Sequence, residues 1–245
     1  MKTIKVLPNT DDVNAELRLL IQQSYDNCTD KLFTIGLSGG SLINSLIKTL
    51  PTLSCVDWTR WRLFFCDERI VPFDDPESTF GCYWRAFENV TPLKKDQFIV
   101  INPDLDGELA ARDYTEKIRS TVKIDEDLAL PRFNLILLGM GPDGHTASLF
   151  PGHKLLEQQI SWVGYIGDSP KPPPKRVTLT YPVINNSDSI IFVCTGLSKA
   201  EILKKIFVDG DDYPAGRVQP DRGELIWLLD KAAGSLLPKE IIGGV

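Results

Sequence analysis

Residues 32–50 read LFTIGLSGGSLINSLIKTL, and this stretch decides the fold. Its first six residues are mostly apolar, which predicts a buried strand over 32–37. A glycine-rich loop follows, and residues 41–50 then carry apolar side chains at helical spacing until Pro51 ends the run. A strand, a short loop and a helix in succession are typical of one unit of a parallel α/β sheet.

The same alternation continues on both sides of this unit. Strands that alternate with helices predict right-handed crossovers and a mostly parallel sheet covered on both faces. We interpret residues 1–245 as a single α/β domain. Further strands are predicted at 3–7, 61–66, 98–101, 133–138, 177–180, 189–194 and 225–229, and further helices at 11–25, 79–88, 106–121, 198–207 and from 231 onward.

Composition excludes several classes of function. The net charge of −6 argues against a nucleic-acid partner, because a phosphate backbone selects basic surfaces. No stretch approaches the roughly 20 apolar residues that cross a bilayer, and the apolar run before Pro8 is too short for a secretory signal. Five scattered cysteines indicate reduced thiols and a cytoplasmic protein. The two histidines lack the partners of a zinc site, so we expect no metal.

The loop 36–41 is the first candidate binding segment, because ligands of doubly wound sheets bind beyond the carboxyl ends of the strands. Its glycines allow an anion to approach the backbone, and the following helix offers free N–H groups. We therefore expect a phosphate site there. One competing interpretation is a tight turn without ligand. A second is a G-x-S-x-G nucleophile elbow at Ser38, which the lack of any histidine after His153 argues against.

Charged residues stand next to several other predicted strands. Asp67, Glu68 and Arg69 follow the strand at 61–66 and form either an exposed polar loop or part of a site. Arg176 precedes one strand and Lys199 follows another. Taken separately, each of these two cations is better explained as a solvated surface charge.

The segment 139–153, GMGPDGHTASLFPGH, contains a formal G-x-G-x-x-G pattern. Its context contradicts a dinucleotide site, because the expected short helix is broken at Pro151 and Asp143 would repel a pyrophosphate. His145 lies at a glycine-rich strand end beside an acid that could orient its ring, which favours a catalytic histidine. Asp143 could instead serve only as a helix N-cap.

The motifs follow one another in a recognisable order from residue 36 to residue 230. The chain contains GLSGGS at 36–41, DERIVP at 67–72, EST at 77–79, GPDGHTASLFPGH at 141–153 and DSPKPPPKRVTLT at 168–180. Gly196, Lys199-Ala200, VQP at 218–220 and WLLD at 227–230 follow. With these motifs the chain resembles the 6-phosphogluconolactonase family, most closely its animal type.

This resemblance implies a Rossmann-like three-layer α/β sandwich, shared with aminosugar-phosphate deaminases and ribose-5-phosphate isomerase. It implies hydrolysis of 6-phospho-D-glucono-1,5-lactone to 6-phosphogluconate, the second step of the oxidative pentose phosphate pathway, without a cofactor or metal. The partner is then the small sugar-phosphate lactone alone, with neither nucleic acid nor membrane. We expect a monomer.

Roles follow from the resemblance and from the needs of the reaction. His145 is the expected general base, and Asp143 or Asp67 would fix its tautomer. Arg69 would either polarise the carbonyl or bind the sugar oxygens. The phosphate would be held by the 38–41 loop and by two cations, with a bidentate contact from the arginine. These phosphate-binding residues are Ser38, Gly39, Gly40, Ser41, Arg176 and Lys199.

Three functions compete with the lactonase. The first is an aminosugar-phosphate deaminase. In the related deaminases the DGH triplet is typically followed by Ile-Ala-Phe-Asn-Glu-Pro, and the glutamate works with the histidine. Here Phe150 occupies that position, and we expect its ring to pack into the interior, as its spacing from Ala147 on one helical turn suggests. The second is a serine esterase that uses Ser38, and the third is a non-catalytic sugar-phosphate-binding module.

Overall fold

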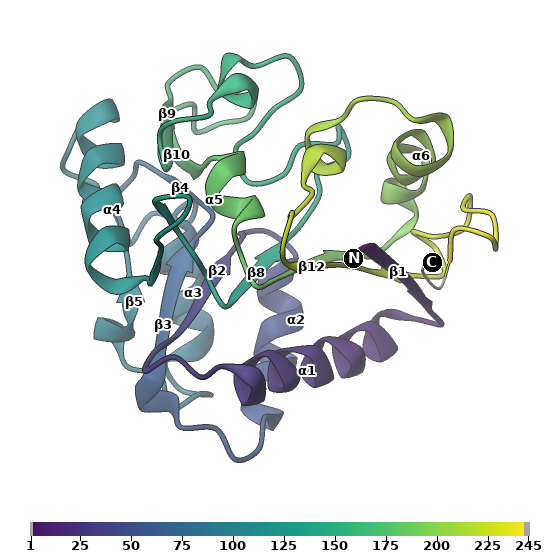
Figure 1. The fold of residues 1–245 in the computed structure, drawn as a ribbon, viewed down its shortest axis with the longest axis horizontal. Helices are drawn as coiled ribbons and strands as arrows, with labels where there is room; N and C mark the ends of the chain where they lie inside the picture. Colours follow the sequence, from purple (N-terminus) through teal and green to yellow (C-terminus); the bar gives the residue numbers. More distant parts are fainter. Residues whose placement is uncertain (1, 243–245) are drawn as a thin grey trace.

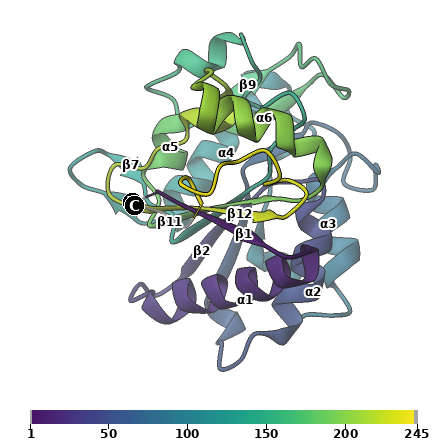
Figure 2. The same ribbon diagram turned by 90° about the vertical axis from the view of Figure 1, so that its right-hand side faces the viewer.

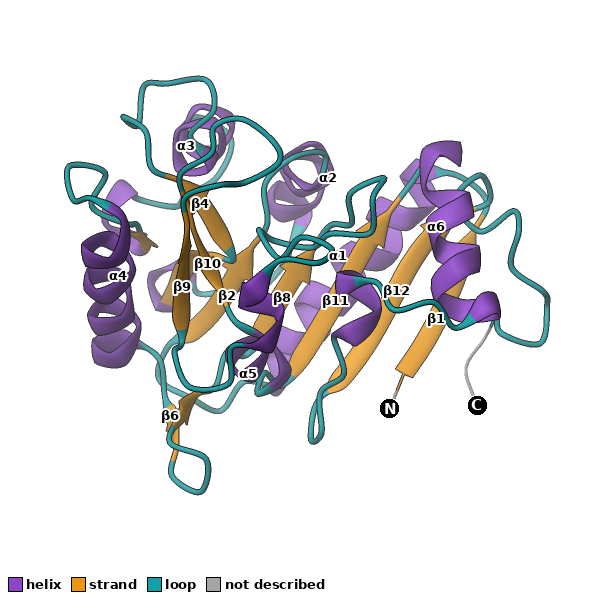
Figure 3. Cartoon of the chain, turned by 90° about the horizontal axis from the view of Figure 1, so that it is seen from above, coloured by secondary structure: helices purple, strands orange, loops and turns teal. Residues whose placement is uncertain are grey.

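The computed structural model describes residues 2–242, and its core is a seven-stranded sheet in which every neighbouring pair is parallel (Figures 1 and 3). The strand order is β1-β12-β11-β8-β2-β3-β5. The prediction of a mostly parallel sheet is confirmed. The strands are β1 (Lys2–Leu7), β2 (Phe33–Leu37), β3 (Trp61–Phe65), β5 (Phe98–Ile99), β8 (Leu135–Leu138), β11 (Ser189–Cys194) and β12 (Glu224–Asp230).

Helices cover both faces of the sheet, which gives three layers (Figure 2). The first helical layer holds α1 (Thr10–Asn27), α2 (Leu42–Thr49) and α3 (Thr79–Phe87), and the second holds α4 (Gly107–Thr121), α5 (Tyr181–Asn185) and α6 (Ala200–Lys204). Leu63 and Phe65 of β3 pack toward the first layer and Phe64 toward the second, because successive strand residues point to opposite faces. The three-layer sandwich is confirmed.

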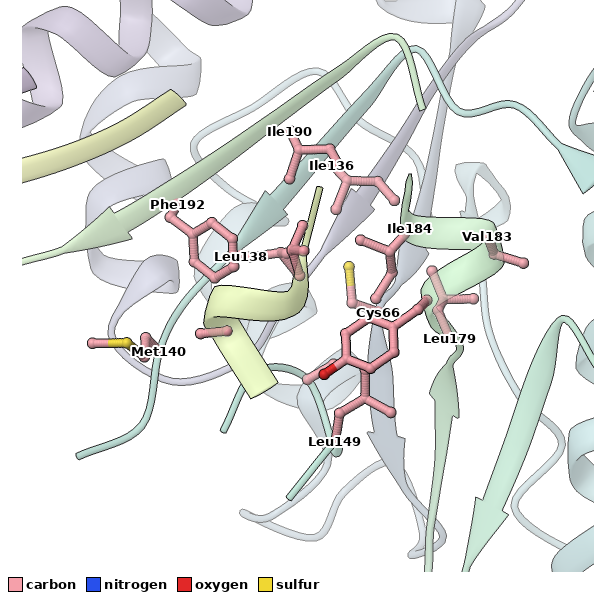
Figure 4. Close-up of a cluster of buried hydrophobic side chains, with 14 of the residues drawn as sticks. Cys66, Ile136, Leu138, Met140, Leu149, Leu179, Val183, Ile184, Ile190 and Phe192 are labelled. Carbon is pink, nitrogen blue, oxygen red and sulfur yellow. The ribbon is translucent and has the colours of Figure 1, made fainter. Parts of the chain in front are cut away.

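A continuous apolar cluster lies between the sheet and the second layer of helices, and Figure 4 shows part of it. Ile136 and Leu138 of β8 lie beside Ile190 and Phe192 of β11, and all four are fully buried. A buried side chain of this size contributes about 1.5–3 kcal/mol to folding. This packing fixes the carboxyl ends of β8 and β11, from which two loops of the candidate site emerge.

A small antiparallel sheet, which the sequence pattern did not predict, lies above the second face. It is formed by β4 (Asp67–Arg69), β9 (Val163–Ile166) and β10 (Arg176–Leu179) in the order β4-β10-β9. The strand predicted at 177–180 therefore exists, but it belongs to this sheet. The amide of Leu179 donates to the carbonyl of Cys66 at 2.7 Å, which joins the small sheet to the end of β3.

One further expectation is wrong. Residues 231–242 form successive turns instead of a helix, because Gly234 and Pro238 lie within the segment and disfavour helical structure. The helix predicted at 198–207 is confirmed as a continuous helical segment over 197–209, in which α6 lies between a 3₁₀ turn at Leu197–Lys199 and a π-helical turn at Lys205–Asp209. The structure also adds a short hairpin of β6 (Ile124–Asp125) and β7 (Leu130–Pro131).

The strand order positions the site. From β2 the chain proceeds to β3 and β5 on one side, whereas β8, β11 and β12 lie on the other. Such a reversal between β2 and β8 opens a crevice beyond their carboxyl ends, where ligands of open α/β sheets bind. Within residues 2–242, the structure contains no helix that is both long and apolar enough to cross a membrane.

Candidate active site

An open cavity of about 210 Å³ lies beyond the carboxyl ends of β2, β3, β8 and β11. All of the predicted site residues except Asp143 line it, and Asp143 contacts His145 from outside the cavity. The topology therefore brings together residues more than 150 positions apart in the chain. The lining residues are Ser38, Gly39, Gly40, Ser41, Asp67, Arg69, Thr79, Gly139, Met140, Gly141, His145, Ala147, Arg176 and Lys199.

The glycine loop offers backbone donors to this cavity. Gly40 has a φ of +72°, a conformation that favours glycine, and it turns the chain from β2 into α2. Among the described residues, the amides of Gly39, Gly40 and Ser41 have no hydrogen-bond acceptor, and the Ser41 side chain does not cap α2. Free amides at a helix N-terminus form an anion site.

Ser38 lacks the features of a nucleophile elbow. Its φ is not positive, and α2 begins only at Leu42 instead of directly after the serine. Its side chain is 5% exposed, and its Oγ has no hydrogen-bond partner within residues 2–242. An activated serine needs a base within hydrogen-bond reach, and none contacts this one.

His145 forms the chemical centre of the cavity. Its Nδ1 lies 2.5 Å from Oδ1 of Asp143, so Asp143 is the carboxylate in contact with this nitrogen. Burial lowers the pKa of His145, and the adjacent carboxylate opposes this effect only in part. Burial alone would raise the pKa of Asp143, but hydrogen bonds from His145 and Lys171 lower it to about 2.

These shifts define the protonation of the pair at neutral pH. Asp143 is ionised and accepts only, so the proton in the short contact is carried by Nδ1 of His145. The Nε2 atom is then unprotonated. The arrangement supplies a neutral imidazole whose ring is oriented through its second nitrogen, as a general base requires.

Packing around the imidazole holds its orientation. The ring of Phe150 lies 4.8 Å from it, centroid to centroid, and the Gly141 amide donates to the His145 carbonyl at 2.8 Å. Position 141 has no room for a side chain, because a Cβ there would collide with the imidazole. Glycine at this position therefore allows the ring to approach the backbone.

The segment after His145 is a tight turn, and the short helix expected there is absent. The Leu149 amide donates to the Thr146 carbonyl at 2.9 Å, and Ala147 has a φ of +47°. Asp143 consequently caps no helix. Phe150 is 1% exposed, so its predicted burial is confirmed, although the helical spacing behind that prediction is wrong.

Arg176 differs from its expected role. It is 3% exposed, its Nε donates to the Pro173 carbonyl at 3.0 Å, and its Nη2 donates to the carbonyls of Lys171 and Pro172 at 2.8 and 3.0 Å. The bidentate phosphate contact expected from Arg176 is therefore wrong, because both donor edges of the guanidinium already include occupied nitrogens. Its Nη1 lies 3.9 Å from Oδ2 of Asp67.

The free guanidinium edge belongs to Arg69 instead. Its Nη1 donates to the carbonyl and carboxylate of Glu77 at 2.7 and 3.0 Å. Its buried Nε has no partner among residues 2–242. Lys199 donates to the Met140 carbonyl at 2.6 Å, which holds its ammonium group at the cavity wall.

Asp67 and Glu68 lie on opposite sides of β4. Asp67 lines the cavity and accepts a 2.7 Å hydrogen bond from Ser148. Glu68 is fully buried and accepts the amides of Arg69, Thr79 and Phe80. Burial raises the pKa of Glu68 to about 7. Glu68 thus joins β4 to the start of α3 and positions its neighbour Arg69.

Sequence reasoning assigned no role to Thr79 or Lys171 and considered Glu68 only as part of the charged segment after the strand at 61–66, although all three lie in the quoted motifs. No apolar alternation marks the strand that buries Glu68, so no local signal could have found it. Lys171 contacts Oδ1 of Asp143 at 3.0 Å and Nδ1 of His145 at 3.2 Å. Within residues 2–242, no cluster of side chains could hold a metal ion.

Known proteins resemble this chain over nearly all of its length. A family model for glucosamine-6-phosphate isomerases and 6-phosphogluconolactonase matches residues 8–227. The 6-phosphogluconolactonases of rat and human are 46% and 45% identical to it, each alignment covering 96% of this chain and 93% of the relative.

Solved structures agree with these matches. A 6-phosphogluconolactonase from Thermotoga maritima has a TM-score of 0.80 at 26% identity, covering 94% of this chain and all of the other. A monomeric glucosamine-6-phosphate deaminase shares the fold, with a TM-score of 0.73 at 20% identity over 96% of this chain and 99% of the other. The chain belongs to the glucosamine-6-phosphate isomerase/6-phosphogluconolactonase family.

Proposed function

We propose that this protein is a 6-phosphogluconolactonase, which hydrolyses 6-phospho-D-glucono-1,5-lactone to 6-phosphogluconate in the oxidative pentose phosphate pathway. One observation carries the proposal: a neutral histidine, oriented by Asp143, faces the same cavity as the unpaired amides of the glycine loop. A base and an anion site in one cavity are what a phosphorylated lactone needs. The names of the animal relatives point to the same reaction.

The phosphate would bind to the amides of Gly39, Gly40 and Ser41 at the N-terminus of α2. Lys199 supplies a positive charge to the phosphate site. The N–H groups of its ammonium that do not donate to the Met140 carbonyl can donate to the phosphate. Arg176 can add only its Nη1. The lactone ring then extends from the glycine loop toward His145 across the cavity.

Hydrolysis begins when Nε2 of His145 removes a proton from a water molecule as its oxygen attacks the lactone carbonyl. The carbonyl oxygen gains negative charge, and the guanidinium of Arg69, which lines the cavity, is the donor that we assign to it. The ring C–O bond then breaks, and the imidazolium returns the proton to the leaving ring oxygen. Asp143 holds Nδ1–H throughout and stabilises the transient imidazolium.

Two substrates distinguish the cation roles. Lys199→Met should raise KM for the phosphorylated lactone by roughly 10-fold or more, since a charge-assisted hydrogen bond is worth about 1.5–3 kcal/mol. It should change the hydrolysis of unphosphorylated gluconolactone much less. Arg69→Gln should instead lower kcat on both lactones. The reverse pattern would exchange the two assignments.

The reaction itself is tested with freshly generated lactone, whose disappearance is followed by NMR against its spontaneous hydrolysis. Rapid hydrolysis with no ammonia release from glucosamine 6-phosphate is the expected result. The apolar ring of Phe150 cannot exchange the proton that ring opening and isomerisation require. Steady-state ammonia production would show that the protein is a deaminase.

We further infer a cytoplasmic protein that works without metal or cofactor. All five cysteines are unpaired thiols, and those of Cys66 and Cys194 are buried, as in proteins of a reducing compartment. Activity that persists after dialysis against a chelator supports the metal-free mechanism. Light scattering after size-exclusion chromatography tests the predicted monomer.

A further inference from the structure

The arm between β9 and β10, residues 168–175, contacts the turn that carries His145 through Lys171. The guanidinium of Arg176 binds three successive carbonyls of the arm, those of residues 171–173. The Ser169 hydroxyl donates to the Lys171 carbonyl at 2.8 Å, and the Lys171 amide lies 3.2 Å from the same hydroxyl oxygen. At the start of the arm, Asp168 contacts Nε2 of His153 at 3.2 Å. The backbone of Lys171 is therefore held in place.

The side chain of Lys171 extends from this backbone to the catalytic pair. Its Nζ lies 3.0 Å from Oδ1 of Asp143 and 3.2 Å from Nδ1 of His145. Since Nδ1 carries a proton, the ammonium donates to the carboxylate and only adjoins the ring. Lys171 is not among the residues that line the cavity, whereas His145 is, so the effect of Lys171 on the reaction is expected to act through His145.

The charges around His145 explain what a cation adds at this place. A carboxylate next to a histidine stabilises the imidazolium, which is useless as a base. Lys171 shares Oδ1 of Asp143 and brings a positive charge beside the ring, which opposes that effect. Asp67 contributes a weaker attraction for the proton from the cavity side. Phe150 packs on the ring without charge.

We propose that Lys171 is a positioning residue that keeps Asp143 ionised, the proton on Nδ1 of His145, and Nε2 free at neutral pH. The catalytic consequence of this contact rests on the function proposed above, whereas the effect of Lys171 on the titration of His145 does not require substrate. Arg176 supports it indirectly, because its three hydrogen bonds fix the arm from which Lys171 extends.

The test measures the titration of His145 by NMR in the substrate-free protein. The chain has only two histidines, so the His145→Gln spectrum assigns both ring signals. Removal of a cation this close should raise the midpoint of His145 in Lys171→Met by on the order of one pH unit. The midpoint of the acid limb of the kcat/KM profile should shift to higher pH by the same amount. The activity of Lys171→Met should therefore fall far more below that of wild type at pH 6 than at pH 8.

Matched variants separate this role from a structural one. Lys171→Arg should restore the wild-type midpoint, and Lys171→Gln should behave like Lys171→Met. Lys175 on the same arm pairs with Asp106 at the surface, so Lys175→Met should leave the midpoint and activity unchanged. Near-UV circular dichroism checks that each variant is folded.

A midpoint in folded Lys171→Met and Lys171→Gln that coincides with wild type would overturn the proposal. An equal shift in Lys175→Met would also overturn it, since the effect would then be one of general charge. If His145→Gln kept lactonase activity, the proposed base would fail, whereas the titration would still decide whether Lys171 controls His145.

Discussion

Replacing Arg176 by Met should cost stability before it affects phosphate binding. The substitution removes three hydrogen bonds to the carbonyls of residues 171–173 and the cation nearest Asp67 in a buried setting. Breaking a buried charge pair from one side typically costs about 3–5 kcal/mol. Asp67 keeps its hydrogen bond from Ser148 and faces the cavity, so we expect the lower end, about 3 kcal/mol.

The assay is urea unfolding of wild type, Arg176→Met and Arg176→Lys, with the free energy of unfolding obtained by linear extrapolation. Lysine keeps the charge but cannot reach three carbonyls at once, so its loss should be intermediate. Because the arm carries Lys171, Arg176→Met should lose activity on both phosphorylated and unphosphorylated lactone. Stability within about 0.5 kcal/mol of wild type, the range of ordinary surface substitutions, with a loss confined to the phosphorylated substrate, would refute this reasoning.

Four further predictions concern the cavity. His145→Gln should lower kcat by about 10²–10⁴ with the fold intact; a variant with more than a tenth of wild-type activity would contradict its role as base. Since burial lowers the pKa of His145, the wild-type kcat/KM should decline as pH falls, with a midpoint below the usual value of about 6.5, as a pH series measures. Gly141→Ala should displace the imidazole and reduce kcat more than it raises KM, which steady-state kinetics would show. Ser38→Ala should keep substantial activity and a fluorophosphonate should not label the protein; an adduct on Ser38, found by mass spectrometry, would restore the esterase hypothesis.

The elements that the sequence predicts well are those whose burial shows in a short window. β2 at Phe33–Leu37 and β11 at Ser189–Cys194 are buried along their whole length, and each is read directly as an apolar run. β4 at Asp67–Arg69 is three polar residues long, so no apolar alternation marks it. Its pairing with β10 depends on a partner more than 100 residues away, which no local pattern encodes.

The cavity could be predicted in outline for a different reason. Parallel strands end at one edge, so Ser38 after β2 and Gly139 after β8 had to lie near each other once both strands were placed. The use of each polar atom could not be predicted in the same way. The sequence alone does not distinguish Arg69 from Arg176. In the structure, the buried Nε of Arg69 has no partner among the described residues, whereas Nε and Nη2 of Arg176 donate to backbone carbonyls.

The arm shows why such assignments require the structure. Lys171 is 28 residues from Asp143 and 26 from His145, and it reaches them only because Arg176 binds the carbonyls around it. One buried guanidinium thus supports the arm, the arm places an ammonium group, and that group sets the charge around the base. Substitutions along this line of contacts should therefore change stability and the pH dependence of catalysis together.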